Sequence, residues 1–157
     1  MNFEELEKLG SLRKDKSNFR QVRTLLDRSE EDLATSKSNL QIDTEWAYAI
    51  AYHAMLRAGR ALMISFGYRP AGKDQHKTIV LFTKALFGTG LKDLIGVFDR
   101  MRRKRHDFIY EPDRPITRQE AEQGILDAEA LLGQIKAIVR EKDPQKGMGI
   151  YNFKGKK

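Results

Sequence analysis

Residues 45–66 form the segment that most restricts what this chain can fold into. Within it, residues 46–56 are rich in alanine and are apolar over much of the circumference that a helix would give them. A helix that is apolar on most sides is stable in water only when neighbouring elements cover it. We therefore expect residues 45–66 to be the central helix of the domain. Asp43 or Thr44 is expected to cap its start, and Gly67 to end it in the left-handed conformation.

Other segments with apolar residues at helical spacing precede and follow residues 45–66. They cover residues 18–36, 75–87, 91–110 and 117–142, and a short amphipathic turn at 3–9 precedes them. Ser17 and Asp74 are candidate helix caps, and Thr117 with Glu120 forms a capping box. All four prolines lie between these segments, and no segment shows a strand period that competes with them.

This pattern predicts an all-α fold, an antiparallel up-and-down bundle of four to five helices. We expect one domain over residues 1–145, with Trp46 and Tyr52 in its core. The basic, glycine-containing tail at 146–157 has two readings, a frayed terminus or a segment that docks on the bundle.

Composition excludes several classes of protein. There is no cysteine, so disulfides, thiolate metal sites and cysteine nucleophiles are excluded. No apolar run approaches the ~20 residues that span a bilayer, and the acidic, amphipathic start does not resemble a secretory signal. We expect a cytoplasmic protein without membrane contact. The 29 Lys and Arg against 22 Asp and Glu, a net charge of +7, favour a polyanionic partner such as nucleic acid.

The segment 91–110 contains a basic run, Arg-Met-Arg-Arg-Lys-Arg-His at residues 100–106. At 100° per residue, Arg105 lies on the apolar stripe of this helix. The other members of the stripe are Leu94, Phe98, Met101 and Phe108. A guanidinium in that position is costly unless it is paired or opens onto a cleft. Such breaks of a local rule tend to mark function.

A second line of side chains lies beside the stripe. It consists of Asp99, Arg103, His106 and Tyr110, within about 60° of one another around the helix axis. His106 and Tyr110 are four residues apart, so their side chains can meet. An imidazole, a phenol and several guanidinium groups are the parts needed to bind a phosphodiester and move a proton. The alternative is a solvated basic face, which is the ordinary role of such runs.

The two remaining histidines have structural interpretations. His76 starts a helix, where a cap or surface role is expected, and His53 lies in the most buried helix as a hydrogen-bonded core residue. The alternative interpretation of His53, which the sequence favours less, is a supporting role near the basic run. The three histidines show no metal-ligand spacing, so we expect no metal and no cofactor. Arg57 and Arg60 are candidates to extend a phosphate-binding cleft.

At the basic run the chain resembles the HEPN-domain family. The family signature is Arg, a polar residue, three variable residues and His, and a looser form is Arg, four to six residues and His. Arg105-His106-Asp107-Phe108-Ile109-Tyr110 matches the tight form up to its last position, and Arg100 with His106 matches the loose form. Residues 46–56, 67–70, 75–78 and the capping box at Thr117 also resemble the family, so that the resemblance covers about 18–142.

The Arg-His…Tyr variant is similar to a bacterial subgroup encoded beside nucleotidyltransferases or in toxin–antitoxin and defence contexts. The resemblance implies a helical homodimer that acts as a metal-independent endoribonuclease at a cleft between subunits. Arginine would hold the scissile phosphate, and histidine would assist attack by the ribose 2′-hydroxyl. The implied catalytic residues are Arg105, His106 and Tyr110, and the implied phosphate- or RNA-binding residues are Arg100, Arg102 and Arg103.

Tyr110 stands where the tight signature has histidine. A phenol with a pKa of about 10 is a poor base at neutral pH, so Tyr110 would orient or regulate. In some relatives a tyrosine near the motif is adenylylated by a nucleotidyltransferase that acts as the antitoxin. Two alternatives to a toxin or defence nuclease remain. One is a non-catalytic module that binds RNA, a nucleotide or a nucleotidyltransferase, and the other is a plain interaction bundle.

Overall fold

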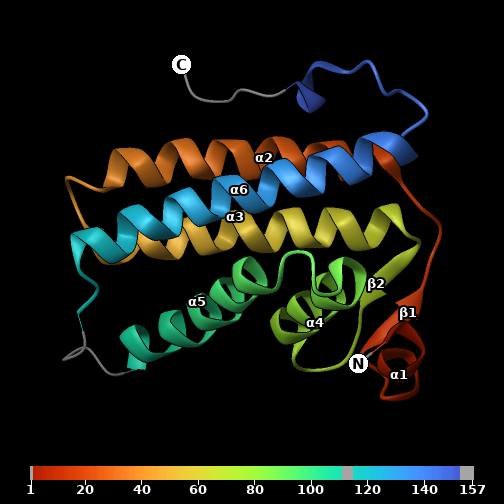
Figure 1. The fold of residues 1–157 in the computed structure, drawn as a ribbon, viewed down its shortest axis with the longest axis horizontal. Coiled ribbons are helices and arrows are strands. Elements are labelled where there is room, and N and C mark those ends of the chain that lie inside the picture. Colours follow the sequence, from red (N-terminus) through yellow and green to blue (C-terminus); the bar gives the residue numbers. More distant parts are fainter. Residues whose placement is uncertain (1, 111–114, 153–157) are drawn as a thin grey trace.

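The computed structural model describes residues 2–110 and 115–152, without the side chains of 108–110, and it confirms the all-α bundle. The helices are α1 (Phe3–Lys8), α2 (Phe19–Asn39), α3 (Thr44–Ser65), α4 (Gln75–Phe87), α5 (Lys92–Tyr110) and α6 (Arg118–Lys142), followed by the short 3₁₀ helix η1 (Gly149–Tyr151). Figure 1 shows α2, α3 and α6 running along the long axis, with α4 and α5 on one side of them.

Helix α3 is the central helix, as its composition predicts. It packs against α2, α4, α5 and α6, and Tyr52 within it is fully buried. Its start is capped by Asp43, whose carboxylate accepts hydrogen bonds from the backbone N–H groups of Glu45 and Trp46 at 3.0 and 3.1 Å. Gly67, at φ +79°, lets the chain turn away in the left-handed region where side chains are strained.

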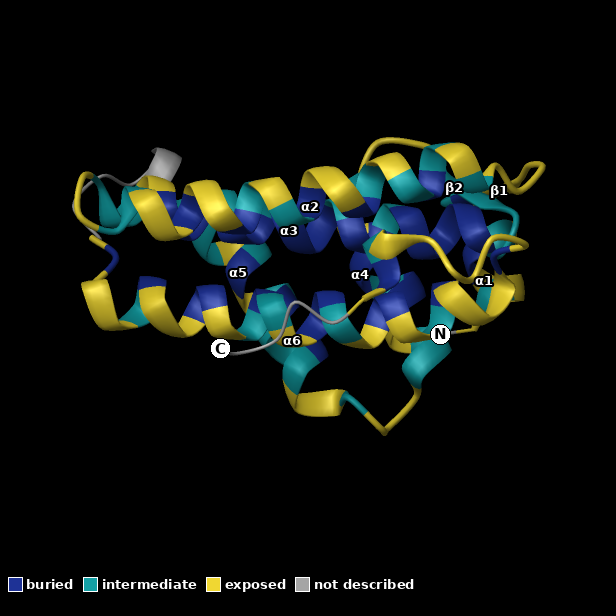
Figure 2. Cartoon of the chain, turned by 90° about the horizontal axis from the view of Figure 1, so that it is seen from above, coloured by how far each residue is buried: buried dark blue, intermediate teal, exposed yellow. Residues whose placement is uncertain are grey.

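Trp46 corrects one expectation. Its side chain is 57% exposed rather than part of the core. It lies in the first turn of α3, and the buried positions of that turn are taken by Ala47 and Tyr48. Figure 2 shows the resulting division along the molecule, with buried residues turned inward and exposed ones on the outer sides of α2 and α6.

The structure also contains a small sheet that the sequence did not predict. Strand β1 (Leu12–Lys14) pairs in antiparallel fashion with β2 (Tyr68–Pro70), with Arg13 opposite Arg69. Each strand has only three residues, and β2 ends in a proline, so neither shows a strand period. The pairing is long-range: the Ala71 N–H donates to the Ser11 carbonyl at 2.8 Å, and the Asp15 N–H donates to the Gly67 carbonyl at 2.9 Å. It ties the N-terminal segment to the loop that leads into α4.

The remaining helix ends agree with the sequence except at two caps. The capping box of Thr117 and Glu120 is present, whereas α2 is capped by Asn18 and not by Ser17. Asp74 precedes α4 but makes no side-chain capping hydrogen bond. The described part of the tail packs on the bundle, because η1 contacts α2 and α6 and its Tyr151 is buried. No helix within residues 2–110 and 115–152 has the length and apolarity needed to cross a membrane.

Gly59 allows α3 and α4 to approach closely. A Cβ at this position would overlap the Ile79 Cγ2 methyl of α4 and would touch Thr83. We expect Gly59→Ala to lower the free energy of unfolding by about 1–3 kcal/mol, because overpacking outweighs the gain in helix propensity. Urea denaturation measures this.

Gly96→Ala is the matched control. In α5 a Cβ at Gly96 would meet only the Arg100 side chain, at an ordinary distance of 3.7 Å. Without a clash, the better helix former is expected to stabilise the protein by about 0.5–1 kcal/mol. Equal effects of the two substitutions would show that α3 and α4 are free to move apart.

Candidate functional site

An open groove of about 760 Å³ lies between the start of α4 and the C-terminal half of α5. Its described lining contains six Lys or Arg side chains against two Asp. The basic residues are Arg60, Lys73, Lys77, Arg102, Arg103 and Arg105, and the others are Asp74, Gln75, His76, His106 and Asp107. Opposed walls with an excess of positive charge concentrate anions between them.

Helix α5 positions its half of the groove through its buried stripe. Phe98 and Met101 are almost fully buried against the bundle, which fixes the rotation of the helix about its axis. Asp99 then holds two of the groove arginines, with its carboxylate 3.0 Å from Arg102 and 3.1 Å from Arg103. These two guanidinium groups are therefore partly neutralised and oriented at one edge of the groove.

The helical spacing predicts Arg105 on the apolar stripe of α5, and its side chain is only partly exposed. Its Nε atom is buried and has no hydrogen-bond partner in the described part of the chain. A buried donor without a partner costs about 1–3 kcal/mol. The same guanidinium lines the groove, where an anion would supply the missing negative charge.

His106 is exposed and lines the same groove as Arg105. The two residues that match the start of the tight signature are neighbours in the sequence, and both border this groove. Tyr110 is the last residue of α5, and its side chain lies outside the described residues. The expected meeting of His106 and Tyr110 stays a prediction.

Opposite α5, His76 lines the groove and belongs to a cluster of three rings, with Tyr52 and His53 behind it on α3. The hydroxyl of Tyr52 and Nδ1 of His76 are 3.1 Å apart, within hydrogen-bond distance. The rings of His53 and His76 meet edge to face, with centroids 6.4 Å apart. Sequence reasoning placed His76 at the surface, where it is, but missed its contact with Tyr52. The two residues are 24 positions apart on different helices, and no sequence signal joins them.

The electrostatics of this cluster depend on Arg105. Partial burial lowers the pKa of His53, and the positive charges of Arg105, His76 and Arg57 lower it further. Partial burial together with Arg105, Arg60 and Arg102 likewise lowers the pKa of His76. Both imidazoles are therefore biased toward the neutral form. Burial raises the pKa of Tyr52, so its phenol keeps its proton at neutral pH.

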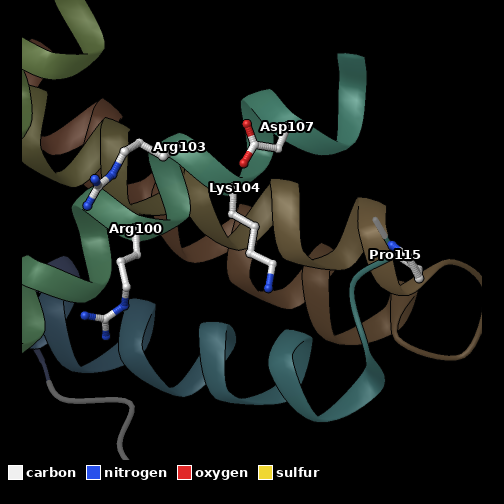
Figure 3. A pocket seen from close by; sticks show the side chains of 5 residues that line it. All are labelled: Arg100, Arg103, Lys104, Asp107 and Pro115. Carbon is white, nitrogen blue, oxygen red and sulfur yellow. The ribbon is translucent and has the colours of Figure 1, made fainter. Parts of the chain in front are cut away.

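Arg100 does not join the groove. It lines a second hollow of about 550 Å³ with Arg103, Lys104, Asp107 and Pro115. Figure 3 shows Arg100 and Lys104 directed from α5 toward α6, where Lys104 contacts Glu120 at 2.7 Å. The loose Arg100–His106 spacing therefore joins residues from two different surfaces of α5, and only Arg103 and Asp107 border both.

The groove offers guanidinium donors and two imidazoles at one surface, which suits binding of a phosphodiester and transfer of a proton. In the part of the chain that the structure describes, no group of three or more His, Asp or Glu side chains is placed to hold a metal ion.

Comparison with known proteins places the chain in a family. No curated protein matches it. The family model for the HEPN domain matches residues 22–138, which is most of the chain and includes the whole of α3 to α5 and most of α2 and α6. The matched region contains every residue of the groove and both signature residues, Arg105 and His106. The chain therefore belongs to the HEPN-domain family.

Proposed function

We propose that this HEPN protein is a metal-independent endoribonuclease whose site is the basic groove between α4 and α5. The observation that carries the proposal is that Arg105 and His106 line one groove, beside Arg102 and Arg103. Arginine suits a phosphate whose charge grows in the transition state. A histidine exposed to the groove suits proton transfer near neutral pH.

The reaction is an internal transfer of the phosphodiester. The ribose 2′-oxygen forms a bond to phosphorus while the bond to the 5′-oxygen of the next nucleotide breaks. His106 takes the proton of the 2′-hydroxyl, and water gives a proton to the departing 5′-oxygen and recovers one from the imidazolium, so that no proton is gained or lost overall. The guanidinium of Arg105 carries the charge on the non-bridging oxygens. The products are a 2′,3′-cyclic phosphate and a free 5′-hydroxyl.

The biological setting belongs to the same proposal. A toxin or defence role, restrained by a nucleotidyltransferase antitoxin, follows from the likeness of the Arg-His…Tyr sequence to that subgroup. A homodimer would place the grooves of two chains near one cleft. Light scattering of the purified protein measures the number of subunits.

We expect the protein to cleave single-stranded RNA in excess EDTA and His106→Ala to cleave it about 10²–10⁴ times more slowly. Loss of the general base removes proton transfer and leaves the phosphate contacts in place. The measurement is the initial rate on a labelled RNA, with circular dichroism to confirm that both proteins are folded. Cleavage by the variant at the wild-type rate would rule out His106.

The second candidate function is binding without cleavage, which the presence of Tyr110 in place of the signature histidine favours. The same assay separates the two. RNA binding by a folded wild-type protein that releases no cyclic phosphate would favour the binding module.

A further inference from the structure

We propose that His76, held by Tyr52, is a second imidazole of this site and donates a hydrogen bond from Nε2 to an RNA phosphate bound beside Arg105. The inference rests on the proposed function, because it assigns a further substrate contact to the same groove. His76 comes from α4, across the groove from the signature residues on α5.

The hydrogen bond to Tyr52 determines which nitrogen faces the groove. Tyr52 is fully buried, and its hydroxyl lies 3.1 Å from Nδ1 of His76. That contact engages Nδ1, so Nε2 is the ring nitrogen left for a ligand. The ring is exposed and lines the groove, which makes Nε2 accessible.

The Tyr52 phenol is compatible with a ring proton on Nε2 in both charge states of His76. A hydroxyl both donates and accepts, and burial keeps Tyr52 protonated. In the neutral tautomer that the proposal assigns, Tyr52 donates to Nδ1, and the single ring proton lies on Nε2. When the imidazole is charged, Nδ1–H donates to the phenol oxygen and Nε2 still carries a proton. His76 therefore presents a donor to the groove in both states, which suits an anion.

The surroundings of His76 are cationic on both packed elements. Helix α3 contributes Arg60, and α5 contributes Arg102 and Arg105, whose charges add to partial burial in biasing His76 toward the neutral form. The ring of His53 on α3 meets that of His76 edge to face. A bound phosphate offsets these charges. It would lie within reach of Arg105, whose buried Nε has no hydrogen-bond partner among the described residues.

The test is an NMR titration of the full chain with a 2′-O-methyl RNA tetranucleotide, which binds as RNA but lacks the attacking hydroxyl. The chain has three histidines, so single variants assign their ring signals. We expect the ligand to shift the signals of both His76 and His106 and to raise the titration midpoint of His76. Ring ¹⁵N shifts in the free protein should show the neutral His76 with its proton on Nε2.

Variants separate the donor role from a structural one. His76→Ala should weaken tetranucleotide binding about 10-fold, the value of a hydrogen bond to a charged group. His76→Gln, whose amide N–H lies near the place of Nε2, should keep most of the affinity. Tyr52→Phe should mix the two tautomers in the ¹⁵N spectrum. Lys84→Gln, an exposed change at the other end of α4, is the control and should change nothing.

The outcomes distinguish this inference from the function it rests on. If the ligand shifts His106 alone, or if His76→Ala binds as tightly as the wild type, His76 is not a contact, while the proposed nuclease stands. If the folded wild-type protein does not bind the tetranucleotide, both are overturned.

Discussion

Arg105→Met is expected to abolish RNA cleavage and, at the same time, to make the protein more stable. The guanidinium would carry the charge of the transition state, and arginines in that role contribute about 10³–10⁵ in rate. Its Nε is also buried and has no hydrogen-bond partner within residues 2–110 and 115–152. Methionine fills similar space without a polar atom, so the free energy of unfolding should rise by about 1 kcal/mol. Initial rates in EDTA and urea denaturation measure the two effects.

Arg103→Met is the matched control for stability. The Arg103 side chain is 62% exposed and pairs with Asp99 at the surface. Its loss should change the free energy of unfolding by less than about 0.5 kcal/mol. If Arg105→Met is less stable than the wild type, Arg105 has a structural partner. The prediction that stability rises while activity is lost would then be wrong.

The fold was largely readable from the sequence because most of its signals are local. The span of α3 follows from a continuous apolar composition and a good cap, and the start of α6 follows from its capping box. The pairing of β1 with β2 is set by contacts between segments more than 50 residues apart, and no local preference marks it. Trp46 was misplaced because composition does not show where neighbouring helices stop covering α3.

For the candidate site, the sequence predicted only the part that lies on one helix, α5. The periodicity of α5 places Arg105 on the apolar stripe, and its partly exposed side chain agrees. Five residues at 100° also put Arg100 about 140° away from Arg105 around the axis, in line with its place in the other hollow. The groove itself needs α4 as its second wall. The contact of His76 with Tyr52 arises from the packing of α4 on α3, which no spacing within one segment encodes.

Charge has opposite consequences at two places in this bundle. Along the groove, the described lining has more cations than carboxylates, and Arg105 buries a donor that has no partner among those residues. On the α2–α6 side, the fully buried Asp143 is surrounded by donors. Its carboxylate accepts from Arg23 of α2 at 2.9 Å to each oxygen, from the Gln145 N–H at 2.8 Å and from the Tyr151 hydroxyl. We infer that the hydrogen bonds around Asp143 stabilise the fold and offset the free-energy cost of the buried Arg105 donor.

Asp143→Ala is therefore expected to lower the free energy of unfolding by about 3–5 kcal/mol, because it leaves the mostly buried Arg23 without its carboxylate. The melting temperature should fall by about 10 °C, at about 2–4 °C per kcal/mol for a chain of this size. Calorimetry measures this. At temperatures where the variant is folded, RNA cleavage should stay unchanged, since Asp143 joins α2, α6 and η1 and does not line the groove.

The effect should depend on pH in a defined direction. Burial alone would raise the pKa of Asp143, but the hydrogen bonds from Tyr151, Gln145 and Arg23 outweigh it and lower the pKa. A carboxyl group with a lowered pKa in the folded state stabilises the protein above the unfolded value of about 3.9, and that stabilisation is lost as the pH falls further. The difference in unfolding free energy between wild type and Asp143→Ala should then have its full value at pH 6 and become smaller below about pH 4.

Glu122→Ala is the control, because it breaks an exposed pair with Arg118. It should lower the free energy of unfolding by less than about 1 kcal/mol. A difference at Asp143 that stays constant down to pH 3 would show that packing, and not the buried charge, holds the tail and the ends of α2 and α6 together.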